Sequence, residues 1–375
     1  MDLILVQRKT GLVSKSKFIH QVEPYLDKDD KKSIKKYLDS GGWLTEHMQT
    51  YELENKVKDF VNRKYAIAVP NGTIAIYLAL LANNIGKGKK VAVPNLTMIA
   101  TINAVIWSGA EPVIIDTDDD MNMCMSYEKL ISTKNIDAVV YVPLNGRTKN
   151  GLKIQKWCKE KNKILIEDSA HALGSKYNKT KMCGSLGEVS VLSFTPHKII
   201  TMGQGGMVLT DKKKIYDQII KLKTFNRSGD KSDWHEGFGL NFKITDLQSS
   251  LGLSQFDKLE IFIKNKKIMH KEYGKKITTK SLEILNFDEL EVPWFIDAFI
   301  NNKTLKNSIL RKLDTNNIGY RDAYPPLSSQ KYLRNIAKTD LSNSLKTKGK
   351  ILWLPSSNGL SKAEISRVAS VLNTL

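Results

Sequence analysis

The feature that most constrains this chain is a repeated alternation of short apolar runs and helical segments. Runs with the length of buried strands lie at residues 66–69, 90–93, 112–115, 138–142 and 163–166. Segments with helical patterning separate most of these runs. The alternation is typical of βα units, in which a helical crossover makes successive strands parallel. We therefore predict an α/β fold with a mostly parallel sheet.

Two more apolar runs, 189–194 and 206–210, are predicted to form adjacent strands. The pattern after residue 257 mixes helical segments with a strand-like run at 294–300, which is typical of a smaller α+β domain. We expect an N-terminal extension over 1–22, a large α/β domain over 23–256 and a small C-terminal domain over 257–375. Ligands of such sheets bind at the carboxyl ends of the strands, so the loops that follow strands should carry the site.

The composition argues against several classes of protein. The 375 residues include 58 Lys and Arg against 39 Asp and Glu, a formal net charge of +19. The lysines are spread along the whole chain, with no arginine-rich arm and no interleaved aromatic residues. We therefore expect a lysine-rich surface and no nucleic-acid partner. The same charge favours an anionic small substrate, such as one that bears phosphates.

Hydropathy and cysteine usage indicate the compartment. No apolar run reaches the ~18 residues that a membrane-spanning helix needs, and residues 1–9 lack the apolar core of a signal peptide. Cys124, Cys158 and Cys183 are too few and too far apart for a disulfide framework or a zinc cluster. We expect a cytoplasmic protein with no membrane partner and no bound metal.

The first loop with candidate functional residues follows the run 66–69 and has the sequence Pro70-Asn71-Gly72-Thr73. A glycine allows a ligand to approach the backbone closely. A threonine at the start of a helix offers its hydroxyl beside amide donors that have no intrahelical partner, and this combination binds phosphate. An ordinary helix cap is the alternative interpretation.

The second loop, Glu167-Asp168-Ser169-Ala170-His171, comes directly after the apolar run 164–166. A carboxylate at the end of a buried strand is costly unless it meets a cation or several hydrogen-bond donors. The protonated ring nitrogen of a cofactor is one such cation. An acidic helix cap is the alternative.

The third loop runs from Ser193 through Lys198 to the glycine-rich segment 203–207. A lysine that is desolvated beyond a buried strand has a lowered pKa, and its neutral amine can form a Schiff base. A surface lysine is the alternative. Together, however, a phosphate cup, a carboxylate and an amine in this order on a parallel sheet are what pyridoxal phosphate needs.

These segments resemble the DegT/DnrJ/EryC1/StrS family of sugar aminotransferases, which are fold-type I pyridoxal 5'-phosphate (PLP) enzymes. The matching segments are 65–73, 167–174, 193–207, 239–248, 319–321 and 354–357. The resemblance extends from about Pro24 to the end of the chain. It implies a fold-type I aminotransferase, with a large domain built on a mostly parallel sheet of the seven-stranded type and a smaller C-terminal α+β domain.

The resemblance also implies roles for individual residues. Lys198 is expected to be the Schiff-base lysine and proton shuttle, and Asp168 to pair with the pyridinium nitrogen. Residues implied to hold the cofactor are Gly72, Thr73, Met98, Asp168, His171, Ser193, Lys198 and Asn241. Of these, Asn241 is implied to reach the cofactor from the partner subunit of a homodimer with shared active sites. Trp234, His235 and Arg321 are implied to meet the nucleotide-sugar.

Several positions depart from the usual family pattern. Met98 stands where an aromatic residue commonly stacks on the cofactor ring, and its polarisable sulfur can pack there instead. His171 replaces a Gln or an acidic residue that neighbours the ring hydroxyl, and a packed, hydrogen-bonded histidine is the alternative. Gln204 replaces a frequent Glu, and the 144–147 segment lacks the usual His and Tyr. These departures affect the expected substrate more than the expected cofactor.

Lys198 also separates the chain from a branch of the family that has histidine at this position and catalyses a dehydration. An amine can form an imine with PLP, whereas an imidazole cannot. The resemblance therefore implies transamination of a nucleotide-linked 4-keto-6-deoxyhexose to the 4-amino sugar, with glutamate as the amino donor. The segments 23–26, 324–327 and 354–357 favour perosamine-synthase-like members.

Other functions remain open from the sequence. The nucleotide can be GDP, dTDP or UDP, and a 3-keto-sugar aminotransferase of the same family is an alternative. A catalytically silent homologue with a binding or regulatory role is a second alternative, from a different class.

Overall fold

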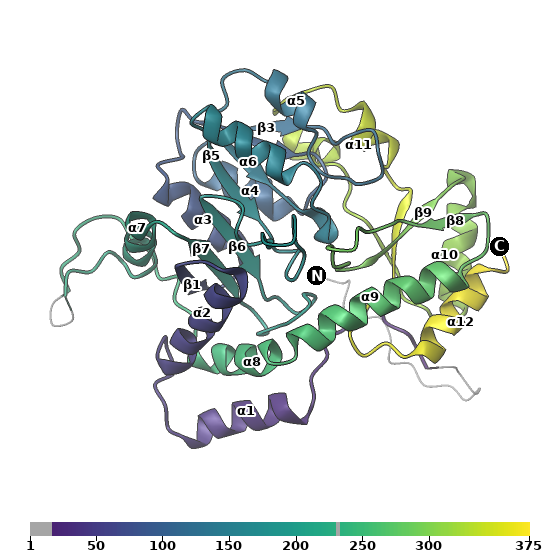
Figure 1. Ribbon diagram of the computed structural model, residues 1–375, viewed down its shortest axis with the longest axis horizontal. Coiled ribbons are helices and arrows are strands. Elements are labelled where there is room, and N and C mark those ends of the chain that lie inside the picture. The colour runs from purple at the N-terminus through teal and green to yellow at the C-terminus, as the bar shows by residue number, and fades with distance from the viewer. Residues whose placement is uncertain (1–16, 230–232) are drawn as a thin grey trace.

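A computed structural model describes residues 17–229 and 233–375. Its large sheet has eight strands (Figure 1). In spatial order they are β1 (Tyr65–Val69), β7 (Gly206–Thr210), β6 (Val189–Ser193), β5 (Ile164–Asp168), β4 (Ala138–Tyr141), β2 (Lys90–Pro94), β3 (Glu111–Ile115) and β11 (Ala337–Lys338). All neighbours are parallel except β1 with β7 and β7 with β6. The predicted α/β class and mostly parallel sheet are confirmed.

Helices cover both faces of this sheet because the strands are apolar on both sides. One face packs against α3 (Gly72–Ala82), α4 (Ile99–Trp107) and α7 (Lys213–Lys223). The other face packs against α2 (Met48–Val61), α5 (Tyr127–Ser132), α6 (Gly151–Glu160) and α8 (Asp246–Phe256). Outside α8 lies α1 (Lys28–Asp39), joined to it by a hydrogen bond of 3.0 Å between the hydroxyls of Ser33 and Ser250.

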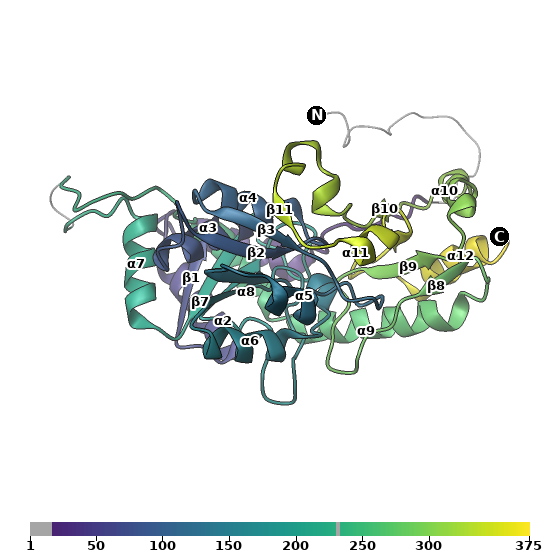
Figure 2. The same cartoon turned by 90° about the horizontal axis from the view of Figure 1, so that it is seen from above.

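A second, antiparallel sheet forms the C-terminal part of the molecule (Figure 2). Its order is β10 (Arg321–Asp322), β12 (Ile351–Leu354), β9 (Ile296–Ile300) and β8 (Leu282–Ile284). The helices of this region are α9 (Leu259–Lys276), α10 (Lys306–Thr315) and α12 (Lys362–Leu372), whereas α11 (Ser342–Lys346) lies at the ends of β2 and β3 of the large sheet. Four 3-10 turns complete the elements: η1 (Leu144–Gly146), η2 (Lys303–Leu305), η3 (Leu327–Ser329) and η4 (Lys331–Leu333).

The predicted elements recur with small shifts in their ends, but three differences matter. The helical pattern of residues 246–266 is divided between two helices, because the chain breaks between α8 and α9, where Lys258 turns to bind Asp27 and Asp30. The strand expected over 294–300 begins only at Ile296, which leaves Trp294 outside it. The eighth strand, β11, is too short for a hydropathy pattern to show.

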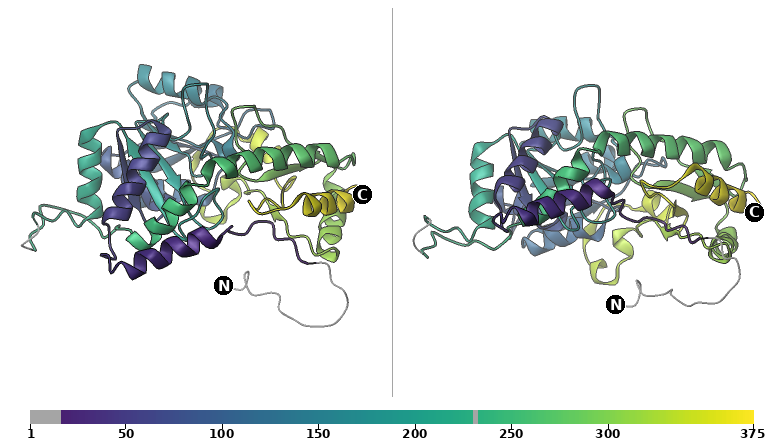
Figure 3. Two further views of the ribbon diagram at one scale, coloured as in Figure 1. Left: turned by 60° about the horizontal axis from the view of Figure 1, so that its bottom comes forward. Right: turned by 90° about the horizontal axis from the view of Figure 1, so that it is seen from below.

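The N-terminal residues that the structure describes lie along both parts of the molecule (Figure 3). Ile19 is buried and forms a parallel bridge with Ile318 in the small C-terminal part. From there the chain runs to α1 on the large part. Residues 1–16 of the expected extension lie outside the described residues, and the boundary at 256 and 257, which falls between α8 and α9, stays a prediction.

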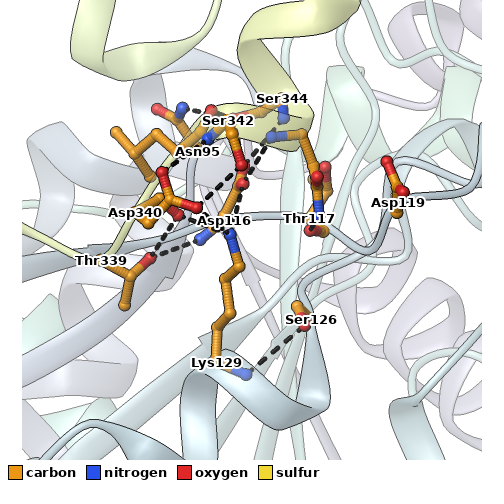
Figure 4. Close-up of polar contacts among 12 residues, drawn as sticks. Asn95, Asp116, Thr117, Asp119, Ser126, Lys129, Thr339, Asp340, Ser342 and Ser344 are labelled. Carbon is orange, nitrogen blue, oxygen red and sulfur yellow. Dashed lines mark hydrogen bonds and ion pairs between the residues drawn. The ribbon is translucent and has the colours of Figure 1, made fainter.

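Polar side chains at the ends of β2 and β3 hold the segment that carries η3 and α11 (Figure 4). Asp116, which follows β3, accepts hydrogen bonds from the amide of Ser344 at 2.9 Å and from Lys129 Nζ at 3.0 Å. Asn95, which follows β2, donates to the Ser344 hydroxyl at 2.7 Å and accepts from the amide of Ser328 at 2.9 Å. The clamp fixes this C-terminal segment over the carboxyl ends of the parallel strands.

A buried ion pair joins the two parts. Arg147, just after η1, pairs with Asp297 on β9, and both side chains are almost fully buried. Asp297 also accepts hydrogen bonds from the Asn145 amide at 2.5 Å and from Trp353 Nε1 at 2.7 Å. These contacts hold η1, at the end of β4, against the second sheet.

We predict that Arg147→Met destabilises the protein by about 3–5 kcal/mol, because it leaves the Asp297 carboxylate buried without its cation. Urea unfolding followed by circular dichroism measures the change. Lys213→Met is the matched control, because it removes an exposed pair with Asp217 and should leave the unfolding curve almost unchanged. Equal curves for the two variants would contradict the prediction.

Candidate active site

A pocket of about 300 Å³ lies at the carboxyl ends of the strands, between the two sheets. Its lining consists of Asn71, Gly72, Thr73, Ile76, Met98, Ala100, Asp168, Ala170, His171, Ser193, Thr195, His197, Lys198, Trp294, Arg321 and Tyr324. The last three come from the C-terminal part. The three loops singled out in the sequence therefore meet in one place, together with a C-terminal wall formed by Trp294, Arg321 and Tyr324, of which only Arg321 was expected from the sequence.

The start of α3 and the end of β6 form one end of the pocket. Asn71 caps the helix by accepting a hydrogen bond from the amide of Ile74 at 3.0 Å. The amides of Gly72 and Thr73 precede the first intrahelical bond and are available to a ligand. A Cβ atom at Gly72 would stand 3.1 Å from the Cβ of Ser193, so glycine allows this close approach. The result is a compact set of donors suited to a phosphate.

Two neighbouring carboxylates end β5 and face opposite sides. Glu167 is fully buried away from the pocket and accepts hydrogen bonds from Ser169, Tyr177 and Ser190 and from the amides of Gly184 and Leu186, at 2.6–2.8 Å. Asp168 lines the pocket and accepts from the Thr101 hydroxyl at 2.8 Å and the Ala170 amide at 3.3 Å. Burial raises the pKa of Asp168, against the lowering effect of Thr101, Ala170 and Lys198. A cation at this carboxylate would favour its ionised form.

Lys198 follows β6 and directs its amine toward the C-terminal wall. Its Nζ atom lies 4.2 Å from the centroid of the Trp294 ring. Burial lowers the pKa of Lys198 to about 7; Arg321 adds to this effect and Asp168 opposes it. A large share of these amines is therefore neutral and nucleophilic at neutral pH.

His171 stands between the carboxylate loop and the wall. Its ring stacks on Trp294 with centroids 4.1 Å apart and a 16° interplanar angle, and its Nε2 lies 3.5 Å from the Tyr324 hydroxyl. Burial, with Lys198 and Arg321 nearby, lowers the pKa of His171 well below its ordinary value, so the ring is neutral. Its Nδ1 is buried and has no hydrogen-bond partner among the residues described. That nitrogen remains for a ligand.

Met98 and Arg321 line the pocket from opposite sides. Met98 is the N-cap of α4, and its Sδ accepts a hydrogen bond from the Ala100 amide at 3.0 Å. Arg321 is exposed on β10, with its guanidinium 5.9 Å from the Tyr324 ring and 5.6 Å from the Trp353 ring. The pocket therefore has an apolar, polarisable side chain on the large part and a cation at its C-terminal rim.

The loop between α7 and α8 lies away from this pocket. Trp234 is 76% exposed, and His235 and Asn241 are exposed as well. The described parts of this loop, on either side of residues 230–232, project beyond α7 (Figures 1 and 2). The structure thus brings Gly72, Thr73, Met98, Asp168, His171, Ser193, Lys198 and Arg321 together, and it does not bring Asn241, Trp234 and His235 to the same pocket within one chain.

Sequence reasoning missed Thr101, Trp294 and Tyr324. Thr101 lies three residues beyond Met98 on the first turn of α4, and its helical spacing could have indicated the contact with the pocket. Trp294 and Tyr324 come from the other part of the molecule. No local pattern could have placed their rings beside His171.

The residues of the pocket fit PLP. The donors of Gly72, Thr73 and Ser193 suit its phosphate, and Asp168 offers a buried carboxylate to its ring nitrogen. His171 Nδ1 is a buried polar atom without a partner among the described residues, and a ring hydroxyl would supply one. Lys198 supplies a neutral amine for the aldehyde.

Residues 17–229 and 233–375 contain no group of three or more His, Cys, Asp or Glu side chains that could hold a metal ion. Among the helices of these ranges, none has the length and apolar character to cross a membrane.

Comparison with known proteins gives the same assignment over almost the whole chain. The DegT/DnrJ/EryC1/StrS aminotransferase family matches residues 24–373. The chain belongs to this family. A GDP-perosamine synthase of Escherichia coli O157:H7 is 31% identical to it over 364 residues, covering 95% of this chain and 98% of the relative. As a family member, the protein is a PLP-dependent aminotransferase.

Solved aminotransferase structures share the fold. PseC of Helicobacter pylori, described as an aminotransferase of pseudoaminic acid biosynthesis, superimposes with a TM-score of 0.88 at 23% identity, over 95% of this chain and 98% of that one. The PLP form of the putative sugar aminotransferase Spr1654 of Streptococcus pneumoniae gives 0.86 at 22% identity, over 96% and 98%. The predicted fold-type I aminotransferase architecture is confirmed.

We predict that Lys198 in the cofactor-free aminotransferase reacts with acetic anhydride with a half-maximal rate near pH 7, as its pKa of about 7 requires. Because burial disfavours the ammonium form, the reactive amine persists down to that pH and is lost below it. Competitive labelling with peptide mass analysis measures the profile. Exposed lysines of the same sample serve as internal controls, with half-maximal rates near pH 10. A Lys198 profile that follows theirs would contradict the prediction.

Proposed function

We propose that this aminotransferase converts a nucleotide-linked 4-keto-6-deoxyhexose to the 4-amino sugar, with glutamate as amino donor. The observation that carries the proposal is that Lys198, Asp168 and the phosphate donors around Gly72 line one pocket. The full-length similarity to GDP-perosamine synthases supports a GDP-linked sugar over dTDP- and UDP-linked ones.

The pocket residues divide the work of holding the cofactor. Gly72, Thr73 and Ser193 would bind the phosphate, Met98 would pack against the ring and His171 would meet the ring hydroxyl. Asp168 would keep a proton on the ring nitrogen through its buried carboxylate. When bound, PLP supplies an aldehyde that captures amines and a ring that withdraws electrons from the substrate carbon.

Lys198 then moves the protons. Nζ would take the proton from the α-carbon of glutamate and hold it within the pocket. In the second half-reaction the direction would reverse, and Nζ would hand a proton to the carbon of the sugar that receives the amine. A pKa of about 7 suits both directions, because the amine accepts and releases a proton with equal ease near neutral pH.

Arg321 is proposed to meet the nucleotide-sugar from the rim of the pocket. Its guanidinium provides a fixed positive charge for a diphosphate. The net charge of +19 assists the approach of an anionic substrate to the whole surface. Both features act on the nucleotide part and not on the reacting carbon.

We propose a cytoplasmic homodimer in which each chain completes the pocket of its partner. Asn241, Trp234 and His235 lie on the projecting loop, outside their own pocket, and would reach the pocket of the partner. Large apolar side chains beside the base of this loop are exposed: Trp43, Leu44, Met48 and Tyr51. The bridge between Thr45 and Thr245 joins the two regions, so one interface would cover both.

We predict that protein supplied with PLP shows a visible imine band that fades with glutamate. Borohydride reduction before glutamate should fix the cofactor on Lys198, as located by peptide mass analysis. Lys198→Arg should lose the band and the adduct, because a guanidinium cannot form the imine, whereas Lys212→Arg, an exposed lysine paired with Glu188, should keep both. No band and no adduct in the wild type would favour the catalytically silent alternative.

We predict that a GDP-linked 4-keto-6-deoxyhexose gives the highest kcat/KM with glutamate, and that initial rates give parallel lines in double-reciprocal plots, as double displacement requires. Mass spectrometry detects the amine in the product. The dTDP- and UDP-linked 4-keto sugars and a 3-keto regioisomer are the matched comparisons. Preference for the 3-keto sugar would replace the proposed substrate with that alternative, and intersecting lines would contradict the mechanism.

A further inference from the structure

Trp294 is the part of the pocket wall that touches the reacting amine. It is buried, with Lys198 Nζ 4.2 Å from its ring centroid and the His171 ring stacked against it at 4.1 Å. The buried indole thus covers one side of the amine. Its exclusion of water contributes to the desolvation that lowers the pKa of Lys198.

Three polar contacts hold Trp294 in place, each from a different segment. Its Nε1 donates to the carbonyl of His197, the residue before Lys198, at 2.6 Å. Its amide donates to the carbonyl of Asn145 at 3.3 Å, and its carbonyl accepts from Lys266 Nζ at 3.0 Å. The indole is therefore tied to the lysine loop itself, to η1 and to α9.

Lys266 is unusual among the many lysines of this chain. It is 3% exposed on α9, and its amine donates to two carbonyls, those of Trp294 and Ser356. Within residues 17–229 and 233–375 it forms no ion pair with a carboxylate. Burying an amine in this way is costly, and the hydrogen bonds it makes are all to main-chain atoms. Its contacts join the pocket wall to the end of β12.

We propose that Trp294 is a positioning residue for the Lys198 amine, and that Lys266 is the buried residue whose hydrogen bond holds Trp294 in place. The inference rests on the proposed role of Lys198 in proton transfer. A proton-transferring amine has to stay within reach of its carbon, and a displacement of about 1 Å costs on the order of 100-fold in rate. A tryptophan that is held at its main-chain amide, its main-chain carbonyl and its ring nitrogen restricts that displacement.

The test compares Lys266→Met with Lys267→Met in the full-length protein. Lys267 is the neighbouring residue of α9 and also donates to a carbonyl, that of Glu289 at 2.6 Å, but it is only half-buried and its hydrogen bond does not involve Trp294. Trp294→Phe is the third variant, which keeps an aromatic ring and removes the Nε1 donor. Circular dichroism and urea unfolding establish that each variant is folded.

The first readout needs no turnover. Competitive labelling of Lys198 in the cofactor-free protein should shift its half-maximal pH upward from about 7 in Lys266→Met, because a loosened indole admits water to the amine. Trp294→Phe should shift it in the same direction, and Lys267→Met should not. The titratable and charged groups facing Lys198 are Asp168, His171, His197 and Arg321, and all three variants retain them.

The second readout is turnover with glutamate and the keto-sugar. Lys266→Met should lower kcat by about 10-fold to 100-fold with little change in either KM, because the amine is misplaced while the substrates still bind. An unchanged labelling profile and kcat in Lys266→Met would overturn the proposed role of Lys266, even if the variant unfolds more easily. If Lys266→Met does not fold, an unchanged profile in Trp294→Phe overturns the proposal. Absence of a borohydride adduct on wild-type Lys198 would instead refute the proposed function.

Discussion

The buried pair between Arg147 and Asp297 is the contact on which the rest of the site depends. It lies where η1, at the end of β4, meets the first strand that follows the pocket wall. Asn145 adds hydrogen bonds to both main-chain groups of Phe295, at 2.6 and 3.0 Å. Because the pocket is formed by one sheet on one side and by Trp294, Arg321 and Tyr324 on the other, its shape follows from how these two parts are joined. A charged pair without access to water tolerates little displacement, so it fixes that relation closely.

The two neighbouring carboxylates at the end of β5 have different roles: one stabilises the fold and the other faces the pocket. Successive side chains on a strand point to opposite faces, so Glu167 and Asp168 enter different environments. Glu167 meets five hydrogen-bond donors and secures the turns after it. Asp168 meets two donors and faces the pocket, where burial raises its pKa. The partly satisfied carboxylate is the one with capacity for a cationic ring nitrogen.

Lys198 and Lys266 show that a lowered pKa does not by itself identify a reactive amine. Burial lowers the pKa of each to about 7. The Lys266 amine is occupied by two carbonyls, whereas the Lys198 amine faces a pocket with a carboxylate, a neutral histidine and a set of phosphate donors. The chemistry of each lysine follows from its neighbours. We propose that Lys266 acts on Lys198 through Trp294, which contacts both lysines.

The sequence by itself determined the α/β class, the approximate ranges of most strands, and the three loops that follow β1, β5 and β6. Hydropathy period, glycines and caps are local properties, and they are visible in a few consecutive residues. The resemblance carried by those loops also determined the aminotransferase family. Only the tertiary structure decided that Trp294 and Tyr324 complete the pocket beside Arg321, that the chain breaks between α8 and α9, and that β11 joins the large sheet. These features depend on contacts between residues far apart in the chain, such as Arg147 with Asp297 and His171 with Trp294, and no local period encodes which distant side chains will meet.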